Sequence, residues 1–434
     1  MIIDFSVSNF RSFRKEQQIS FIASNYDKAL PGNLIELELP RLEGMKLLRA
    51  VGLYGANASG KTNVLEALKF LGKFVATSAT RLDEGDETGA EPFLLHPAAS
   101  EQPSEFALRF VVDGVRYHFA LVVNRKRVLY ECLAAFPNGR EQTWYERSWN
   151  EEKEEYDWAP KRSTAFKRDA RIVGYTRSNA SFLSTAAKWN NDQIKPVFRW
   201  FRQNLRFFGT DFASSSLSIR FTTHFMQRGP DEQRKIERLL RHGDIGVLSA
   251  KVTEYEFAKE DLPTGLPEEL IRKILDGKKR IEVNLEHRGA SGRGYPLSWK
   301  YESSGTKRLF SLAGPWLDIL ENGYVAGVDE IESSMHPAMA VELLRLVFNP
   351  DLNRGNAQIL FTTHNPLLLD QTLLRRDQIW FADKDDEGGT HLYPLSDYKP
   401  RKGESLVRGY LAGRYGAVPF IPCGLLGKED ADGR

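Results

Sequence analysis

Short stretches of apolar residues separated by turn residues open the chain, a pattern that predicts β-strands. We expect strands over the following ranges: 2–7, 17–23, 34–39 and about 47–54. The last of these leads directly into a Gly-rich turn. Beyond the turn, apolar residues recur at helical spacing, at Val64, Leu68, Leu71 and Val75. The order of strand, loop and helix is the context that a phosphate-binding loop requires.

The spacing of apolar residues changes in the middle of the chain. From about 92 to 133, apolar and polar residues alternate, which predicts an antiparallel sheet with a hairpin turn at Asp113-Gly114. Helical periodicity then follows over 183–205, 231–240 and 267–275. We therefore interpret 145–285 as an inserted, mainly helical arm.

From Pro296 the chain returns to alternating strands and helices, a layout typical of a parallel αβ sheet. The expected elements, in chain order, are a strand over 296–301, a helix over 307–320, a strand over 325–328, a helix over 338–348 and a strand over 358–362. The predicted organisation is 1–144 and 286–422 as two halves of one head, 145–285 as the arm, and 423–434 as a disordered tail.

Composition narrows the class of protein. The chain has 434 residues, of which 41% are hydrophobic and 27% charged, so it can bury a large core. No apolar stretch reaches the roughly 18 residues of a spanning helix, and the start of the chain lacks a signal-peptide layout. We expect a cytoplasmic protein without a membrane partner. Cys132 and Cys423 are too few for a disulfide framework or a zinc site.

The Gly-rich turn matches the phosphate-binding pattern G-x-x-x-x-G-K-[ST] from Gly55 to Thr62. Backbone amides around Gly55 and Gly60 would wrap the phosphates of ATP, Lys61 would reach the β- and γ-phosphates, and Thr62 would hold Mg²⁺. Asn57 and Asn63 are counted among the nucleotide-binding residues with them.

An apolar strand over 325–328 ends in two adjacent carboxylates, Asp329 and Glu330. Beside a phosphate-binding loop, the two carboxylates of such a pair have different roles. Asp329 would complete the Mg²⁺ shell, and Glu330 would orient and deprotonate the attacking water.

Two further segments fit the same site. Ser304-Gly305 stands directly before a predicted helix, and a turn at a helix N-terminus binds anions. His364 ends the strand over 358–362, where an imidazole can bond the γ-phosphate.

These motifs together resemble the RecF/SMC/OLD branch of ABC ATPases, in particular the compact AAA-annotated ATPases that include RloA-type and PARIS-type anti-phage defence proteins. The phrases that carry the resemblance are Asn9-Phe10-Arg11-Ser12-Phe13, Glu302-Ser303-Ser304-Gly305-Thr306, Asp329-Glu330-Ile331-Glu332, Thr363-His364-Asn365 and Gly413-Arg414-Tyr415-Gly416-Ala417-Val418-Pro419. The resemblance implies an α/β, ABC-ATPase-like head with a mixed sheet and an antiparallel subdomain. It also places Arg11 near the nucleotide.

Three features depart from the usual family pattern. Thr306 and Lys307 replace a glycine and a glutamine of the signature, so capping of the γ-phosphate would rest on Ser304 and Gly305. No clear Q-loop glutamine stands between the phosphate-binding loop and the arm, and the segment after Glu330 is atypical.

Weaker signals receive plainer interpretations. Asp383, Asp385 and Asp386 resemble the acidic pair of a TOPRIM nuclease, yet no matching glutamate stands upstream, so we expect a solvated turn. Basic clusters offer candidate contacts to nucleic acid but are more often solvated faces. They lie at 125–127, 161–171 and 278–280.

The resemblance leaves two functions open. In one, a homodimer or higher even oligomer hydrolyses ATP with Mg²⁺ and controls an effector nuclease of TOPRIM or HNH type encoded nearby. In the other, the chain is a repair or recombination ATPase that binds DNA directly, as RecF does.

Overall fold

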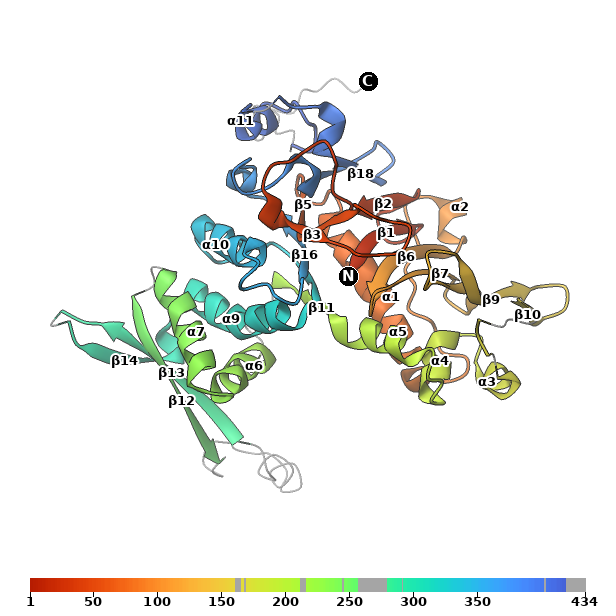
Figure 1. Ribbon diagram of the computed structural model, residues 1–434, viewed down its shortest axis with the longest axis horizontal. Helices are drawn as coiled ribbons and strands as arrows, with labels where there is room; N and C mark the ends of the chain where they lie inside the picture. Colours follow the sequence, from red (N-terminus) through yellow and green to blue (C-terminus); the bar gives the residue numbers. More distant parts are fainter. Residues whose placement is uncertain are drawn as a thin grey trace, which may run out of the picture. The chain divides into compact units, whose positions relative to one another are not determined.

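The computed structural model describes residues 1–160, 165–167, 169–210, 216–243, 246–256, 279–290, 292–401 and 403–418, and forms two compact units (Figure 1). Unit 1 comprises Met1–Phe207, Asn322–Ile331 and Leu343–Arg434; unit 2 comprises Phe208–Glu321 and Glu332–Glu342. Each unit therefore takes segments from distant parts of the sequence. No described helix combines the length and apolar content needed to cross a membrane.

Unit 1 contains a six-stranded sheet with the strand order β11-β15-β16-β5-β17-β18. These strands span, in chain order, Ala50–Tyr54 (β5), Leu205–Phe208 (β11), Val325–Val328 (β15), Gln358–Thr363 (β16), Ile379–Lys384 (β17) and Thr390–Pro394 (β18). β15, β16, β5 and β17 pair in parallel, and β18 pairs with β17 antiparallel. Every residue of β5, β15 and β16 is buried, as expected for central parallel strands.

A seven-stranded sheet with the order β10-β9-β8-β7-β6-β1-β2 forms the rest of the framework of unit 1. Its strands are Ile2–Ser8 (β1), Gln17–Ser20 (β2), Ser104–Val112 (β6), Val115–Val123 (β7), Val128–Phe136 (β8), Gln142–Asn150 (β9) and Glu155–Ala159 (β10). Every pairing in it is antiparallel. A separate two-stranded sheet joins Leu34–Glu36 (β3) to Lys46–Leu48 (β4).

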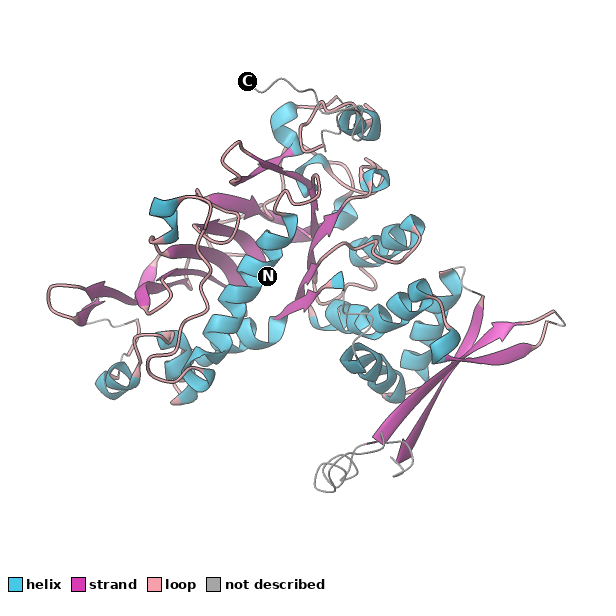
Figure 2. Cartoon of the chain, turned by 180° about the vertical axis from the view of Figure 1, so that it is seen from behind, coloured by secondary structure: helices cyan, strands magenta, loops and turns pink. Residues whose placement is uncertain are grey.

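Helix α1, Lys61–Arg81, unites the core of unit 1. Its apolar face, including Val64 and Leu68, belongs to one buried cluster that also holds Phe5 and Leu121 of the seven-stranded sheet and Leu53 of the six-stranded sheet. The remaining helices of unit 1 are short (Figure 2). They are Pro31–Asn33 (η1), Pro97–Ser100 (α2), Ala170–Tyr175 (α3), Phe182–Lys188 (α4), Lys195–Arg199 (α5), the π-helical turn Trp200–Asn204 (η2), Pro366–Leu368 (η6), Arg376–Gln378 (η7), Leu395–Tyr398 (η8) and Leu406–Leu411 (α11).

A buried polar cluster fixes α4 to the seven-stranded sheet. Glu131 of β8 accepts hydrogen bonds from the Tyr145 hydroxyl (2.8 Å), the Ser181 hydroxyl (2.7 Å) and the backbone amide of Phe182 (2.8 Å). Arg147 of β9 pairs with it at 2.7 Å, and both side chains are 0% exposed. Burial and the Glu131 charge raise the pKa of Tyr145 well above its ordinary value. The Glu131 charge can be buried here because the carboxylate is paired with Arg147 and accepts hydrogen bonds at both oxygens.

Unit 2 combines helices with a three-stranded antiparallel sheet. Its elements are Ser216–Gln227 (α6), Pro230–His242 (α7), Val247–Glu256 (β12), Lys279–Arg288 (β13), Gly294–Ser298 (β14), Trp299–Tyr301 (η5) and Ser304–Asn322 (α9). α6 and α9 approach closely where Thr222 donates to the carbonyl of Phe310 at 2.9 Å, because Gly314 leaves room for it. The division between the units falls within α10, Pro337–Phe348.

The predicted fold class, an α/β head with a mixed sheet and an antiparallel subdomain, is confirmed. The hairpin at Asp113-Gly114 forms, with φ of 48° and 73° at its two turn residues.

The predicted arm differs from what the structure contains. β9 and β10 extend the seven-stranded sheet, so the stretch after 145 begins in unit 1, and unit 2 starts only at Phe208. The region is also less helical than expected, since it contains β12 and most of β13. The helix predicted over 267–275 and the tail over 423–434 lie outside the described residues.

Candidate nucleotide site

The phosphate-binding loop connects β5 to α1, as the motif predicts, and two of its glycines are required by close neighbours. Gly60 has a φ of 101°, and a Cβ there would overlap the hydroxyls of Thr390 and Ser12. At Gly55, a Cβ would collide with the carbonyl of Ala382 on β17. The conformation of the loop therefore depends on its own glycines and on contacts with segments that are distant in the sequence.

Lys61 and Thr62, the predicted nucleotide- and metal-binding residues, open the helix that follows the loop. Lys61 is buried, at 4% exposure, and its ammonium donates to the carbonyls of Gly55 (3.0 Å) and Ala56 (2.8 Å). The side chain thus curls over the loop, where it can exchange these carbonyls for phosphate oxygens. Thr62 donates to Asp329 Oδ1 at 2.9 Å. Asn57 is exposed in the loop.

The acidic pair lies at the carboxyl end of β15, two strands away from β5 in the sheet order. Thr362 of β16 bridges the pair: its hydroxyl donates to Asp329 Oδ1 at 2.7 Å and accepts from the amide of Glu330 at 2.7 Å. Glu330 has a φ of 46°, a left-handed conformation that costs a non-glycine residue energy and that recurs at functional sites. Asp329 and Glu330 are therefore held in fixed and different orientations.

His364 follows the last residue of β16, so the parallel strands bring it to the same edge as the acidic pair. Its Nε2 lies 3.6 Å from Glu330 Oε1, and the two side chains are 35% and 41% exposed. Lys61, Thr62, Asp329, Glu330 and His364 all belong to unit 1. The structure brings together the residues that the sequence assigned to metal, water and γ-phosphate.

Arg11 and Asn63 lie on the side of the loop that faces β18. Arg11 Nε bonds Glu91 Oε2 at 2.7 Å, and Asn63 donates to the Ser12 hydroxyl at 2.7 Å. Arg11, Ser12, Asn63 and Glu91 also line a pocket of about 320 Å³, together with Pro92, Phe93, Leu94, Leu95, Arg125, Lys384 and Gly388. The lining therefore combines polar side chains with two exposed leucines, Leu94 and Leu95.

Two residues that hydrogen-bond at the phosphate-binding loop, Ser12 and Thr390, were not predicted as site residues from the sequence. The Thr390 hydroxyl donates to the Ser59 carbonyl (2.9 Å) and contacts the Ser12 hydroxyl (2.8 Å). Neither Ser12 nor Thr390 belongs to the phosphate-binding motif, and nothing local in the sequence marks Thr390. Ser12 does lie inside the N-terminal phrase that carries the family resemblance.

The signature turn belongs to unit 2 and opens α9. Ser303 caps the helix by accepting from the amide of Thr306 at 3.1 Å, while Ser304 is exposed. A Cβ at Gly305 would lie 2.8 Å from the carbonyl of Ser334, so this position favours glycine. Ser304 and Gly305 thus form an accessible turn at a long helix N-terminus, which suits an anion.

The weaker sequence signals show no site of their own. Asp385 closes the β17–β18 hairpin by accepting from the amides of Gly389 (2.7 Å) and Glu387 (3.0 Å). The His391 imidazole at 3.0 Å lowers the pKa of Asp385. Within the described residues, no group of three or more His, Cys, Asp or Glu is arranged to hold a metal. Parts of the basic clusters at 161–171 and 278–280 lie outside the described residues.

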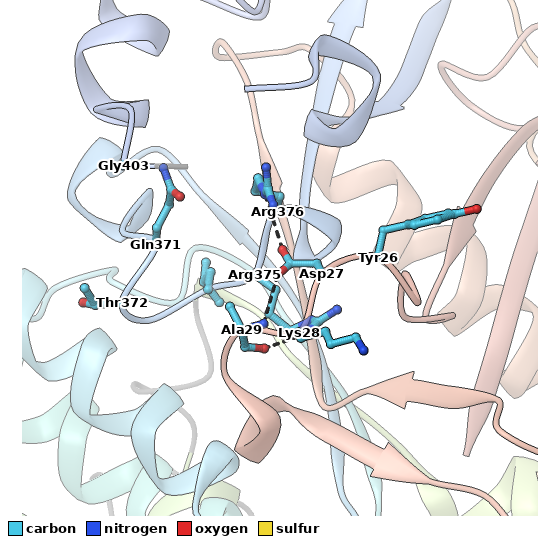
Figure 3. A pocket seen from close by; sticks show the side chains of 10 residues that line it. Tyr26, Asp27, Lys28, Ala29, Gln371, Thr372, Arg375, Arg376 and Gly403 are labelled. Carbon is cyan, nitrogen blue, oxygen red and sulfur yellow. Dashed lines mark hydrogen bonds and ion pairs between the residues drawn. The ribbon is translucent and has the colours of Figure 1, made fainter. Parts of the chain in front are cut away.

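A second pocket, of about 550 Å³, is lined by residues of the 24–29 loop, by residues of 371–376 and by Gly403 (Figure 3). Its arginines are engaged in internal bonds: Arg376 pairs with Asp27 at 3.3 Å, and Arg375 donates to the carbonyl of Ala29 at 2.7 Å. These arginines hold the 24–29 loop in place and do not contribute to the nucleotide site.

Comparison with known proteins identifies a family. The family model described as "AAA domain, putative AbiEii toxin, Type IV TA system" matches residues 50–370. No curated protein matches the sequence.

Two solved structures are similar to the chain. The SmcHead bound to the C-winged helix domain of ScpA is 14% identical, with a TM-score of 0.43, and the match covers 92% of this chain and 99% of that one. The Smc head domain with an extended coiled coil, bound to the C-terminal domain of ScpA derived from Pyrococcus furiosus, is 13% identical, with a TM-score of 0.40, and the match covers 92% and 97%.

Proposed function

This chain belongs to the AAA domain family described as a putative AbiEii toxin of a type IV toxin–antitoxin system, and from that premise we propose that it binds ATP with Mg²⁺ and hydrolyses it to ADP and phosphate. One observation carries the proposal. The Thr62 hydroxyl and the Asp329 carboxylate, 267 residues apart in sequence, lie 2.9 Å apart beside the phosphate-binding loop. A hydroxyl and a carboxylate meet at this loop in P-loop ATPases because together they hold the metal.

The residues of the site fit Mg²⁺, which prefers oxygen ligands and is bound by few protein groups together with phosphate oxygens. Thr62 and Asp329 would hold the ion. When bound, it would neutralise charge on the β- and γ-phosphates. Lys61 would add a fixed positive charge, and the backbone amides of the loop would orient the phosphates.

Glu330 is the general base of the proposal. Its carboxylate would accept a proton from the attacking water as the water oxygen bonds to the γ-phosphorus and the bond to the ADP oxygen breaks. His364, 3.6 Å from Glu330, would bond a γ-phosphate oxygen. Glu330→Gln should bind ATP normally and hydrolyse it about 100- to 10,000-fold more slowly. Wild-type turnover by this variant would remove Glu330 from the mechanism.

We also propose that two chains share each site. The signature turn of one subunit, at Ser304 and Gly305, would cap the γ-phosphate on the loop of the other, giving two equivalent sites around a two-fold axis. Mixing inactive Lys61→Ala and Ser304→Arg chains should restore partial hydrolysis, because one site of the heterodimer is intact. A mixture that exchanges subunits by native mass spectrometry yet stays inactive would contradict sharing.

In the cell, we propose that this dimer senses infection and controls an effector nuclease, as the resemblance of its motifs to those of anti-phage defence ATPases implies. Co-purification with a nuclease encoded beside the gene is the expected result. A chain that purifies alone and is stimulated severalfold by DNA would favour a repair ATPase instead.

A further inference from the structure

A carboxylate is buried directly before the signature turn. Glu302 lies between η5 and the capping residue Ser303, and its side chain is 2% exposed. His287 Nε2, from β13, lies 2.8 Å from Glu302 Oε1, which requires the imidazole proton on Nε2. Burying a carboxylate is unfavourable unless it is hydrogen-bonded, so His287 is a principal reason why Glu302 can occupy this place.

Two other contacts near the turn are local. The Trp299 ring packs against Phe310 of α9 at 5.2 Å, and Lys307 Nζ reaches the carbonyl of Lys300 at 3.4 Å. These contacts hold the turn to its own helix. The bond between His287 and Glu302 differs, because it joins the turn to a neighbouring strand of the three-stranded sheet.

That strand is the middle strand of the three-stranded sheet. β12 and β13 pair from Val247 and His287 at one end to Glu256 and Lys279 at the other (Figure 1). The end that carries His287 is packed in unit 2: Val247 is buried, and the amide of Ala250 donates to Glu237 of α7 at 3.2 Å. The imidazole therefore projects from the anchored end of a stiff element.

We propose that His287 is a positioning residue for ATP hydrolysis. By fixing Glu302, it orients the start of α9, and so presents the Ser304 hydroxyl at the angle needed to complete the nucleotide site of a second chain. His287 itself touches neither nucleotide nor metal. The inference rests on the proposed function, in which Ser304 and Gly305 act on the partner's ATP.

The first test separates binding from turnover. His287→Ala should leave the Kd for ATP unchanged, because the phosphate-binding loop is in unit 1. The same variant should lower kcat about tenfold, which is the kinetic equivalent of losing one hydrogen bond to a charged group. His287→Gln, whose amide can donate to the same carboxylate, should recover most of kcat. Arg288→Ala changes the next, exposed residue of the same strand and should behave as wild type.

The second test uses subunit mixing, because a chain that is merely destabilised would not show the expected pattern of rates in the mixtures. His287→Ala has an intact phosphate-binding loop, so mixing it with Lys61→Ala should create one fully intact site and raise the rate. Mixing it with Ser304→Arg should not, because both chains then carry an impaired signature. If His287→Ala fails to fold, His287→Phe keeps a ring of similar size without the donor and enters the same mixtures.

The outcomes distinguish the two proposals. An inactive mixture of Lys61→Ala with Ser304→Arg refutes the shared site, and with it the role given to His287. If that mixture is active, but His287→Ala has wild-type kcat or gains nothing from Lys61→Ala, the role of His287 alone is refuted.

Discussion

Thr362→Val should slow ATP hydrolysis sharply while leaving the fold intact. Valine has nearly the shape of threonine, but it removes the hydroxyl that donates to Asp329 and accepts from the Glu330 amide, each at 2.7 Å. Thr362 is fully buried, so no water can replace the lost partner without opening the strand. A hydrogen bond to a charged group contributes about 1.5–3 kcal/mol, so kcat should fall about ten- to hundredfold.

Steady-state hydrolysis with saturating Mg²⁺ and ATP measures this effect, and calorimetry checks nucleotide binding. Binding should weaken less than turnover, because Lys61 and the loop amides are untouched. Thr362→Ser is the matched control: it keeps the hydroxyl and should keep most of kcat. Equal rates for the Val and Ser variants would show that the hydroxyl does not orient the acidic pair.

Three further changes test other parts of the structure. Lys61→Ala should weaken ATP binding about ten- to hundredfold, measured by calorimetry with Mg²⁺, since it removes a charged donor; unchanged affinity would exclude the predicted role. Gly60→Ala should lower the free energy of unfolding by about 1–3 kcal/mol and abolish ATP binding. Gly44 is the control: its backbone is also left-handed, but a Cβ there would have nothing within 4 Å, so Gly44→Ala should retain binding. Glu131→Ala should cost about 3–5 kcal/mol in denaturant unfolding, because it leaves Arg147 buried without its partner; a loss below 1 kcal/mol would contradict that account.

The sequence predicts well what is encoded locally. Gly55 to Thr62, with an apolar strand before and an amphipathic helix after, specifies loop and helix without knowledge of the rest of the chain. Asp329 and His364 are equally local signals, because a polar residue at the end of an apolar strand in a parallel sheet falls at one edge. Strand order then brings Asp329 to Thr62 and His364 to Glu330.

What the sequence did not reveal depends on contacts between distant segments. Ser12 and Thr390 bond each other across the chain, and neither stands in a motif of its own. β13 is a different kind of omission. Ile281, Val283 and Leu285 alternate with polar residues and so carry a strand signal, but they fall at the end of the stretch that we interpret as a mainly helical arm.

The position of β5 in its sheet has a consequence for biosynthesis. This strand carries the phosphate-binding loop and ends at Tyr54, yet its sheet neighbours are β16, which begins at Gln358, and β17. At the usual speed of translation, a ribosome needs about 15–60 s to make the intervening chain. Throughout that interval β5, a wholly apolar strand, has unpaired backbone N–H and C=O groups along both of its edges. Such edges can pair with other chains and so promote aggregation. The residues proposed to bind ATP can therefore come together only after β15 and β16 have been synthesised.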